Sequence, residues 1–510
     1  MGKAWHGAPT RRDTRNRNAV VALAIVLFLA ISTILVRHRE HDSGVLDHHE
    51  KLSDALNSIE DETLVNATIG DFGSKARKVA ALADLAELHT EQPSLNHTLL
   101  ASSITEQFPW WNPDTLSYIP WRSRRTFEPW AKGQHQAKTG IVISVGEPLI
   151  WEAAHLISSL RNVLRSKLPI QIAYAGDADL SPARREFLST FGNNLEFIDL
   201  TTVFDDSIVG FKGWAMKPFA ILASRYPRTI LVDADMLFFH APDKIFEKYQ
   251  GLKDTGALYF KDRAIYMFLN GRNGWLKDQL DNAGREPSKH LTHDSLFWKM
   301  LTSEEADSAM VAVDLSRPRQ YLTMLFTAWM NSNETRAFTY KMFYGDKETY
   351  WISNELTGTP YAFEPWSAAQ LATNTTDDGK ETADRHCTSH MAHALPDGSD
   401  IFWANGGIWR DKRYKMQGFV SFKDWFLGQR IDESIASINF TAEGSKEKLA
   451  LTQPIWAGKQ QCSQHNQTAW MPLSAYSKKI NEKLIGEARL VERAFAALKT
   501  KEDAAELISS

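Results

Sequence analysis

Between Gly140 and Asp235 the sequence alternates short apolar runs with helical patterns, and few folds accommodate such an alternation. Runs such as GIVISVG (140–146) and RTILVDAD (228–235) are rich in β-branched residues and are bounded by glycines or acids, as buried strands are. Apolar residues recur at helical spacing between these runs. The pattern predicts an α/β fold, in which a mostly parallel open sheet is flanked by helices and ligands bind at the carboxyl ends of the strands.

The composition excludes one class of partner. The chain holds 58 basic and 62 acidic residues, so its formal net charge is −4, and 43% of its residues are hydrophobic, enough for a sizeable core. Nucleic-acid-binding proteins carry a concentrated basic surface, which this balance does not provide. We therefore expect no nucleic-acid partner.

Near the N-terminus, residues 19–36 form an uncharged apolar run of 18 residues, long enough to cross a bilayer as a helix. Five basic residues precede the run and three follow it within a similar distance, a bias that places the N-terminus in the cytosol. We expect a cytosolic tail (1–18) and a single transmembrane signal anchor (19–36). A cleaved signal peptide is the alternative, although the abrupt stop at Arg37 favours an uncleaved anchor.

Features of the lumenal side agree with this orientation. Every glycosylation triplet follows the proposed anchor; the triplets begin at Asn66, Asn96, Asn333, Asn374, Asn439 and Asn466. Both cysteines, Cys387 and Cys462, also follow it. An oxidising lumen favours a disulfide between them, which would stabilise the fold by about 4 kcal/mol, and two unpaired buried thiols are the alternative.

Three segments are expected after the anchor. Residues 37–135 read as a lumenal stem, whose aromatic stretch (110–130) can dock on the next domain. Residues 136–475 form the α/β domain, and residues 476–510 form one amphipathic helix. The apolar stripe of that helix is expected to pack on the main domain; it consists of Leu484, Ala488, Val491, Phe495 and Leu498.

The triplet Asp233-Ala-Asp235 is the sharpest chemical feature. It follows a strand and is bracketed by the apolar runs TILV and MLFF, so its carboxylates are partly desolvated, which is costly unless they are paired or bound to metal. Hard oxygen ligands suit Mn²⁺ or Mg²⁺, which can clamp phosphate oxygens as a Lewis acid. A second triplet, Asp177-Ala-Asp179, leads into Ser181-Pro182 and reads as a polar loop before a helix, where acids are favoured.

Four blocks, in this order, resemble glycosyltransferase family 71, the fungal Golgi α-mannosyltransferases. They lie at residues 213–247, 307–331, 344–356 and 386–407, within a resemblance that spans roughly 136–425. The GDKE motif (345–348) and the histidine-rich last block resemble the α-1,3 branch more than the α-1,2 branch. One departure is Ser308-Ala309, where relatives often carry Ser-Gly.

The resemblance implies a GT-A-type nucleotide-sugar-binding fold and a type II protein of the Golgi membrane with a lumenal catalytic domain. It implies a metal-dependent retaining transferase that moves mannose from GDP-mannose, with Mn²⁺ (or Mg²⁺), to an oligomannoside glycoprotein acceptor in α-1,3 linkage. Alternatives are an α-1,2-mannosyltransferase, a transferase for another nucleotide sugar, and a non-catalytic scaffold or lectin-like protein.

For the metal and the nucleotide, the resemblance implies that Asp235 coordinates the cation and that Asp233 binds the cation or the ribose. His390, or its neighbour His393, is the candidate third ligand, with a structural histidine as the alternative. Lys217 is a candidate diphosphate contact, unless it is a solvated lysine at a helix start. Gly146, at the end of the first predicted strand, is a further candidate for the nucleotide site.

Asp346 and Glu348 of the GDKE motif are the candidate catalytic acids, which would hydrogen-bond the donor mannose or the acceptor. An exposed turn around Lys347 is the alternative. Retention of configuration needs either a covalent nucleophile or attack from the face that the phosphate leaves. No residue stands out as a nucleophile, which favours same-face attack, driven by electrostatics and orientation.

Overall fold

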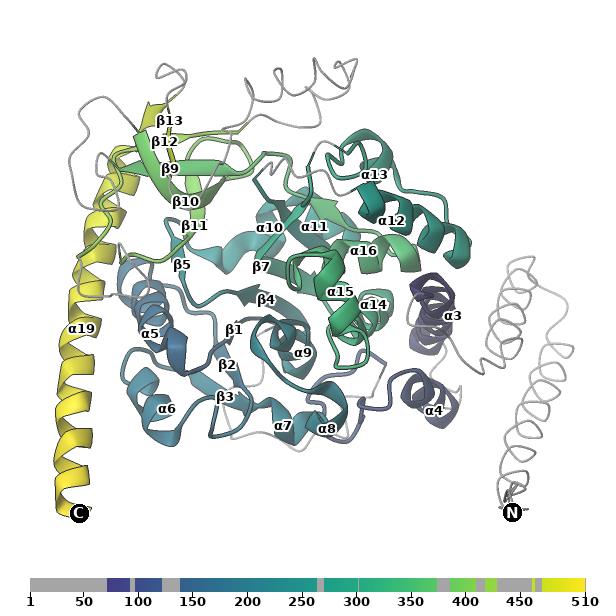
Figure 1. Ribbon diagram of the computed structural model, residues 1–510, viewed down its shortest axis with the longest axis horizontal. Coiled ribbons are helices and arrows are strands. Elements are labelled where there is room, and N and C mark those ends of the chain that lie inside the picture. The colour runs from purple at the N-terminus through teal and green to yellow at the C-terminus, as the bar shows by residue number, and fades with distance from the viewer. Residues whose placement is uncertain are drawn as a thin grey trace, which may run out of the picture. The chain divides into compact units, whose positions relative to one another are not determined.

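The computed structural model describes residues 71–91, 97–121, 138–263, 270–300, 302–373, 386–409, 418–428, 461–463 and 470–509 (Figure 1). The predicted tail and anchor (1–36) and five of the six glycosylation triplets begin outside these residues; Asn333 lies within them. No helix in the described part of the chain is both long and apolar enough to span a bilayer.

The larger sheet has the strand order β3-β2-β1-β4-β7-β6-β8. Its strands are β1 (Thr139–Ser144), β2 (Ile170–Tyr174), β3 (Leu195–Asp199), β4 (Arg228–Val232), β6 (Ala257–Lys261), β7 (Ala306–Asp314) and β8 (Ala362–Phe363). β1 to β4 pair in parallel, and so do β6 and β8. The predicted α/β, mostly parallel sheet is confirmed. The exception is β7, which runs antiparallel to both of its neighbours, β4 and β6.

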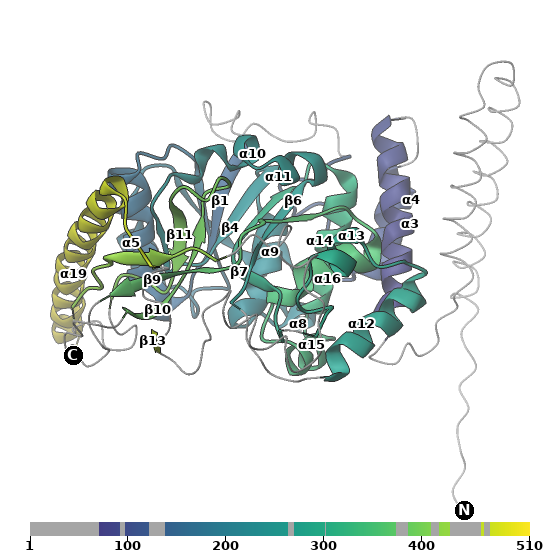
Figure 2. The ribbon, with the colours of Figure 1, turned by 90° about the horizontal axis from the view of Figure 1, so that it is seen from above.

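Helices cover both faces of this sheet because its strands are apolar on both sides. Along β1, Ile141 and Ile143 belong to one buried cluster and Val142 belongs to the other, the two-residue period of a strand. The Val142 cluster includes α9 (Met216–Ala223), α14 (Pro318–Met330) and α16 (Lys347–Thr357). The Ile141 cluster includes α5 (Ile150–Ser158), α6 (Pro182–Ser189) and α19 (Ala475–Ser509). Figure 2 shows the sheet between these groups.

The remaining helices are short or peripheral. They are η2 (Glu147–Leu149), η3 (Ser159–Val163), α7 (Leu200–Val203), α8 (Asp206–Val209), η4 (Gly213–Ala215), η5 (Pro242–Lys244), α10 (Ile245–Lys248), α11 (Gln250–Thr255), α12 (Asn270–Ala283), α13 (Lys289–His293) and α15 (Arg336–Met342).

Part of the predicted stem belongs to the folded core. α3 (Phe72–Glu91) contacts α14 and α12, and α4 (His97–Gln107) packs beside α3. Phe72, Trp110 and Trp111 are buried, and the Trp111 indole N–H donates to the hydroxyl of Tyr321 on α14 (3.0 Å). The folded unit therefore begins at Asp71 or earlier and not at residue 136, because these apolar side chains complete the α14 face of the core.

A second sheet has the order β14-β12-β9-β10-β11-β5, and β13 pairs with β10. Its strands are β5 (Met236–Phe238), β9 (Ala369–Thr373), β10 (His386–Ala394), β11 (Ile401–Asn405), β12 (Asp424–Phe426), β13 (Gln461–Ser463) and β14 (Met471–Pro472). The turn between β4 and β5 therefore joins the two sheets. The backbone register places Cys387 opposite Cys462, and their disulfide stays a prediction.

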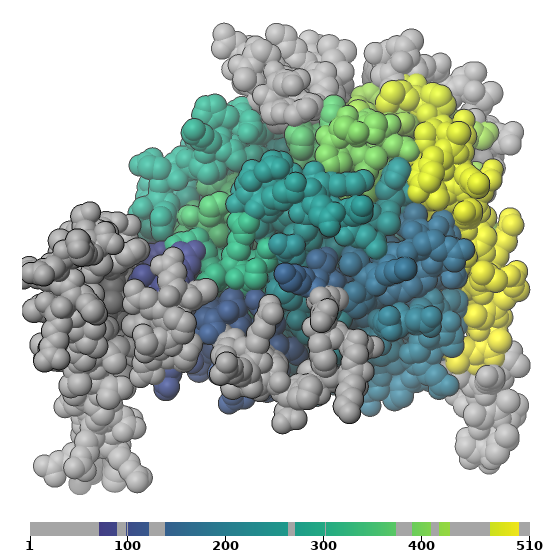
Figure 3. All heavy atoms as spheres, turned by 180° about the vertical axis from the view of Figure 1, so that it is seen from behind, coloured from purple at the N-terminus to yellow at the C-terminus, as the bar shows by residue number. Residues whose placement is uncertain are grey.

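α19 packs along the α5 side of the domain (Figure 3). Leu484, Ala488 and Val491, three members of the predicted stripe, are buried. The backbone carbonyl of Leu484 lies 2.9 Å from Nε2 of the buried His155 on α5. The helix therefore closes the cluster beneath α5.

Candidate functional site

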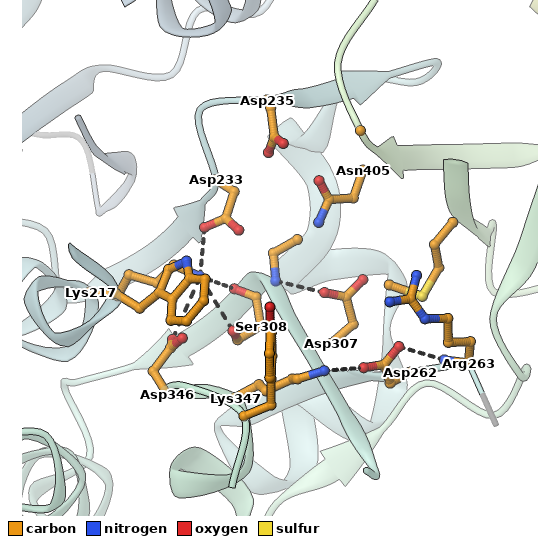
Figure 4. Close-up of a pocket in the computed structure, with 15 residues that line it drawn as sticks. Lys217, Asp233, Asp235, Asp262, Arg263, Asp307, Ser308, Asp346, Lys347 and Asn405 are labelled. Carbon is orange, nitrogen blue, oxygen red and sulfur yellow. Dashed lines mark hydrogen bonds and ion pairs between the residues drawn. The ribbon is translucent and has the colours of Figure 1, made fainter. Parts of the chain in front are cut away.

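A cavity of about 300 Å³ opens beside the turn that follows β4 (Figure 4). Its lining comes from segments far apart in the sequence and is mostly polar. The lining residues are Trp214, Lys217, Asp233, Asp235, Asp262, Arg263, Asp307, Ser308, Ala309, Tyr344, Asp346, Lys347, Met391, Asn405 and Gly406. The cavity thus lies at the carboxyl end of a central strand, where an α/β sheet binds its ligands.

The turn that carries Asp233 and Asp235 is fixed from two sides. On one side, the Asp233 amide donates to the Ala309 carbonyl at the start of β7 (2.8 Å). On the other, the Asp235 carbonyl accepts the amides of Gly406 (3.3 Å) and Gly407 (2.7 Å). Gly406 and Gly407 have φ of +135° and +74°, conformations that favour glycine. Backbone hydrogen bonds therefore position both carboxylates before any ligand arrives.

Lys217 is the buried cation of the cavity. Its Nζ lies 2.7 Å from Oδ1 of Asp233 and 3.6 Å from Oδ2 of Asp346, and it donates to the Ser308 carbonyl and hydroxyl (both 3.3 Å). Burial alone would lower the pKa of Lys217, but the two carboxylates outweigh it and raise that pKa. Because its ammonium is buried and paired, Lys217 is not a solvated lysine at a helix start.

Asp233 is an unusually basic carboxylate. Burial raises its pKa, Lys217 opposes that rise, and the charge of Asp235 adds to it, so that the pKa of Asp233 reaches about 7. Two carboxylates that repel each other within one turn form a site that a further cation would stabilise.

The two acids of the GDKE motif have different surroundings. Asp346 is 3% exposed and lines the cavity, where its Oδ2 has Lys217 as an ion-pair partner. Glu348 is fully buried and lies outside the lining. Its Oε1 accepts the amides of Glu305 (3.0 Å) and Ala306 (3.1 Å), and its Oε2 accepts the Trp351 indole N–H (2.5 Å). The motif is therefore not an exposed turn, and the structure brings only Asp346 to the cavity.

Lys347, between these two acids, also lies in the wall. Its Nζ is 2.6 Å from Oδ2 of Asp262 and 3.1 Å from Oε2 of Glu304. Burial alone would lower the pKa of Lys347, but these carboxylates raise it. The ion pairs join the start of α16 to the residue after β6 and to the segment before β7.

Asp307 is a cavity residue that the sequence reasoning did not single out. Its Oδ1 accepts the Ala309 amide (2.9 Å) and its Oδ2 lies 3.2 Å from Nε2 of the fully buried His393. Burial would raise the pKa of Asp307, but the hydrogen bond with His393 outweighs it and lowers that pKa. Its place in the cavity follows from the direction of β7, because only an antiparallel β7 brings its first residues to the carboxyl end of β4.

His390 and Gly146 lie apart from the lining. His390 is buried, and its Nε2 lies 2.7 Å from the Gly407 carbonyl, so its ring supports the Asn405–Gly407 turn from behind. A Cβ at Gly146 would come within 2.5 Å of an Asp179 carboxylate oxygen, so this glycine allows two loops to approach. Asp179 itself accepts the Ala175 amide (3.0 Å), and Asp177 pairs with Arg185 (2.7 Å), as in an ordinary loop.

The donor set of the cavity fits a hard divalent cation. Mg²⁺ and similar ions commonly bind to one or two carboxylates, and substrate phosphates supply further ligands. Asp233 and Asp235 provide such carboxylates. Within the described residues, no group of three or more His, Cys, Asp or Glu side chains is arranged to hold a metal ion.

Comparison with known proteins adds to this geometry. Residues 138–394, half of the chain, match a family model described as "Mannosyltransferase putative". The chain is 26% identical over 310 residues to the "Probable alpha-1,3-mannosyltransferase MNT4" of Saccharomyces cerevisiae, covering 55% of this chain and 52% of that protein. It is 23% identical over 298 residues to the "Alpha-1,3-mannosyltransferase MNT2" of the same yeast, covering 53% and 51%.

This chain thus spans about half the length of these relatives. Among solved structures, the chain is similar to a galactosyltransferase, LgtC, in complex with donor and acceptor sugar analogs. The similarity covers 44% of this chain and 72% of the LgtC chain. At 14% identity and a TM-score of 0.28, that likeness carries no argument.

Proposed function

This chain belongs to the mannosyltransferase family whose model it matches, and we propose that it is a metal-dependent retaining glycosyltransferase. The proposed reaction moves mannose from GDP-mannose to a mannoside in α-1,3 linkage. One observation carries the proposal: Lys217, Asp233, Asp235 and Asp346 line one cavity beside the turn after β4. The names of the yeast relatives support the linkage.

Asp235, with Asp233 beside it, would hold Mn²⁺ or Mg²⁺, and a cation bound there stabilises the charge of a departing diphosphate as a Lewis acid. The charges of the chain favour that arrangement. The charge of Asp235 raises the pKa of Asp233, and a bound cation would offset that repulsion. A diphosphate would supply further oxygen ligands to such a cation.

The remaining polar groups would orient the donor sugar. Asp346 and Asp307 present buried carboxylates that can accept hydrogen bonds from sugar hydroxyls, and the Lys217 ammonium can donate to a sugar or phosphate oxygen. Because these groups are held by backbone amides, His393 and each other, they need little reorganisation when the donor binds. This preorganisation is the contribution of the chain to catalysis.

In the proposed same-face reaction, the bond between the anomeric carbon of mannose and the phosphate oxygen breaks. A bond from that carbon to the acceptor hydroxyl oxygen forms on the same face. The hydroxyl proton passes to the departing phosphate oxygen, so no side chain has to take it. The carboxylates of Asp346 and Asp307 fix the orientation of the sugar during this exchange.

The cellular setting is also part of the proposal. We propose a type II protein of the Golgi membrane that is anchored by residues 19–36, carries its catalytic domain in the lumen and acts on oligomannosides of glycoproteins. The apolar run, the basic residues before it and the glycosylation triplets after it support this setting. Fractionation of cells with protease protection of the tagged C-terminus would test it.

The reaction is tested with the full chain, because α3 and α4 belong to its core. Purified protein is given GDP-mannose, Mn²⁺ and α-mannobiose, and the product linkage is read by NMR. The Asp235→Ala variant and an EDTA control should both abolish transfer. The Asp177→Ala variant, which alters the other Asp-Ala-Asp triplet, should leave transfer unchanged.

The other outcomes separate the alternatives. An α-1,2 product, or transfer only from another nucleotide sugar, would overturn the linkage or the donor and keep the site. Transfer that persists in EDTA would overturn the metal dependence. Failure to bind any nucleotide would favour a non-catalytic scaffold or lectin-like protein.

A further inference from the structure

Two aromatic side chains remain exposed where they line the cavity. The exposed fractions are 49% for Trp214 and 64% for Tyr344, and their ring centroids lie 5.4 Å apart with planes inclined at 46°. Among the tryptophans that the structure describes, Trp214 is the one with a largely exposed side chain. Exposed aromatic surface beside a polar cavity is characteristic of a ligand-binding surface.

Both rings are held from the inside. Gly345, between Tyr344 and Asp346, has a φ of +74°, and a Cβ there would lie 2.8 Å from Cε3 of Trp214. The indole therefore packs against the backbone of the GDKE motif. On the other ring, the Lys347 ammonium lies 5.2 Å from the centroid of Tyr344. These contacts preorganise the two rings without covering their exposed surfaces.

The two aromatic rings also lie at one end of the donor site. Trp214 precedes Lys217 by one helical turn, and Tyr344 precedes Asp346 by two residues. Lys217 and Asp346 form the 3.6 Å ion pair described above. In Figure 4, Asp233 and the Lys217 ammonium lie between Asp235 and Asp346. The aromatic rings therefore belong to the Asp346 end of the cavity, while the proposed metal carboxylate lies at the other.

We propose that Trp214 and Tyr344 form the acceptor subsite, on which a pyranose ring of the mannoside acceptor stacks. The inference rests on the proposed function and adds the surface that binds its second substrate. A pyranose presents an apolar face of C–H groups, whose slight positive charge complements the negative face of an aromatic ring. The hydroxyls at the edge of the same sugar stay in water or turn toward the cavity.

The chemistry of the donor favours a sugar over the nucleobase as the occupant. In GDP-mannose the diphosphate stands between guanosine and mannose. With the diphosphate at Asp233 and Asp235 and the mannose toward Asp346, guanosine extends away from the aromatic pair. The acceptor must approach the anomeric carbon of the mannose, which places it on the Trp214 and Tyr344 side.

The test measures the binding of the two substrates separately, on the full chain. Saturation-transfer NMR follows α-mannobiose, and calorimetry follows GDP with Mn²⁺. For Trp214→Ala and Tyr344→Ala we expect the Kd or KM for the mannoside to rise by about tenfold, and GDP affinity to stay as in the wild type. Trp214→Phe should recover part of the mannoside binding. Tyr476→Ala, which removes another exposed aromatic outside the cavity, should bind both ligands normally.

The other outcomes either overturn the inference or separate it from the proposed function. Unchanged mannoside affinity in both alanine variants would overturn it, as would a wild-type chain that binds no mannoside. Weakened GDP affinity with intact mannoside binding would assign the rings to the nucleobase. If the wild type binds mannoside through Trp214 but transfers no sugar from any nucleotide donor, the proposed reaction fails and the aromatic subsite stands.

Discussion

At the scale of single residues, burial and partners separate side chains that look alike in the sequence. Asp346 and Glu348 stand two positions apart, yet one lines the cavity and the other accepts three N–H groups inside the wall. A carboxylate whose two oxygens both accept buried N–H groups stabilises the fold, whereas one that faces a cavity can bind a ligand. Substitution of Asp346 should therefore lower the activity, and substitution of Glu348 should lower the stability of the fold.

We predict that Asp346→Asn lowers kcat/KM for transfer by about 100-fold, because the donor sugar loses a positioning contact, and that the melting temperature hardly changes. Glu348→Gln should lower the free energy of unfolding by about 2 kcal/mol, because an amide NH₂ would face N–H donors. Transfer assays and thermal melts on both variants check this. A stable, inactive Glu348→Gln protein would contradict the assignment.

Lys217 gives a second prediction at this scale. Lys217→Met removes the ammonium between the half-buried Asp233 and the buried Asp346 and leaves both carboxylates without their cation, so the free energy of unfolding should fall by about 3 kcal/mol. The double variant Lys217→Met/Asp233→Asn should recover part of that loss, since it also removes a charge. Urea denaturation of the variants measures the coupling. A single variant as stable as the wild type would refute it.

At the scale of elements, the strands and helices of 139–232 follow from apolar periodicity, but the direction of β7 does not. The run AMVAV of β7 is buried on both faces and reads the same as a parallel or an antiparallel strand. Asp307 could therefore not be assigned to the cavity beforehand. The sequence of α3 favours a stem for a related reason: its lysine, arginine and acidic residues obscure the buried side of the helix, which includes Phe72 and Val79.

The contact between α5 and α19 predicts a pH dependence of stability. Burial lowers the pKa of His155 to about 4, from an ordinary value of 6.5, while its hydrogen bond with Leu484 opposes that shift. Between these two values the unfolded chain binds a proton that the folded chain does not, so stability is present above pH 6.5 and falls as the pH drops. From pH 7 to pH 5 the loss from this group should be about 2 kcal/mol.

Urea denaturation at both pH values measures that loss. In the His155→Gln variant the difference between pH 7 and pH 5 should shrink by the same amount, because the titrating group is gone. If the free energy of unfolding changes equally between the two pH values in both proteins, His155 is not the source of this pH dependence.

At the scale of the whole molecule, the sequence sufficed for the family and the sheet class but not for the limits of the domain. The predicted resemblance to α-1,3-mannosyltransferases is confirmed. Two of the four blocks that carry it, 213–247 and 344–356, contain Lys217, Asp233, Asp235 and Asp346, which line one cavity. Trp214 and Tyr344 lie in the same blocks, but only their exposed fractions distinguish them from core aromatics.

Ligand removal gives a prediction at this scale. GDP with Mn²⁺ at 100 times its Kd should stabilise the folded chain by about 2.7 kcal/mol, because the pair binds only the folded cavity. EDTA should reverse the shift in melting temperature, and Asp235→Ala should show none. An equal shift from GDP in the presence of EDTA would contradict a role for the metal in nucleotide binding.

The hydrogen bonds that hold the Asp235 carbonyl also order the assembly of the site in time. Their donors are the amides of Gly406 and Gly407, and β5 pairs with β11. The turn therefore cannot form until a segment some 170 residues further along the chain has been synthesised. A ribosome adds roughly 5–20 residues per second, so the turn stays open for about 10 to 30 s. During that interval the apolar strand Met236–Phe238 lacks its partner, and an unpaired strand edge invites aggregation. A nascent chain of this protein should therefore bind chaperones until residue 407 has emerged.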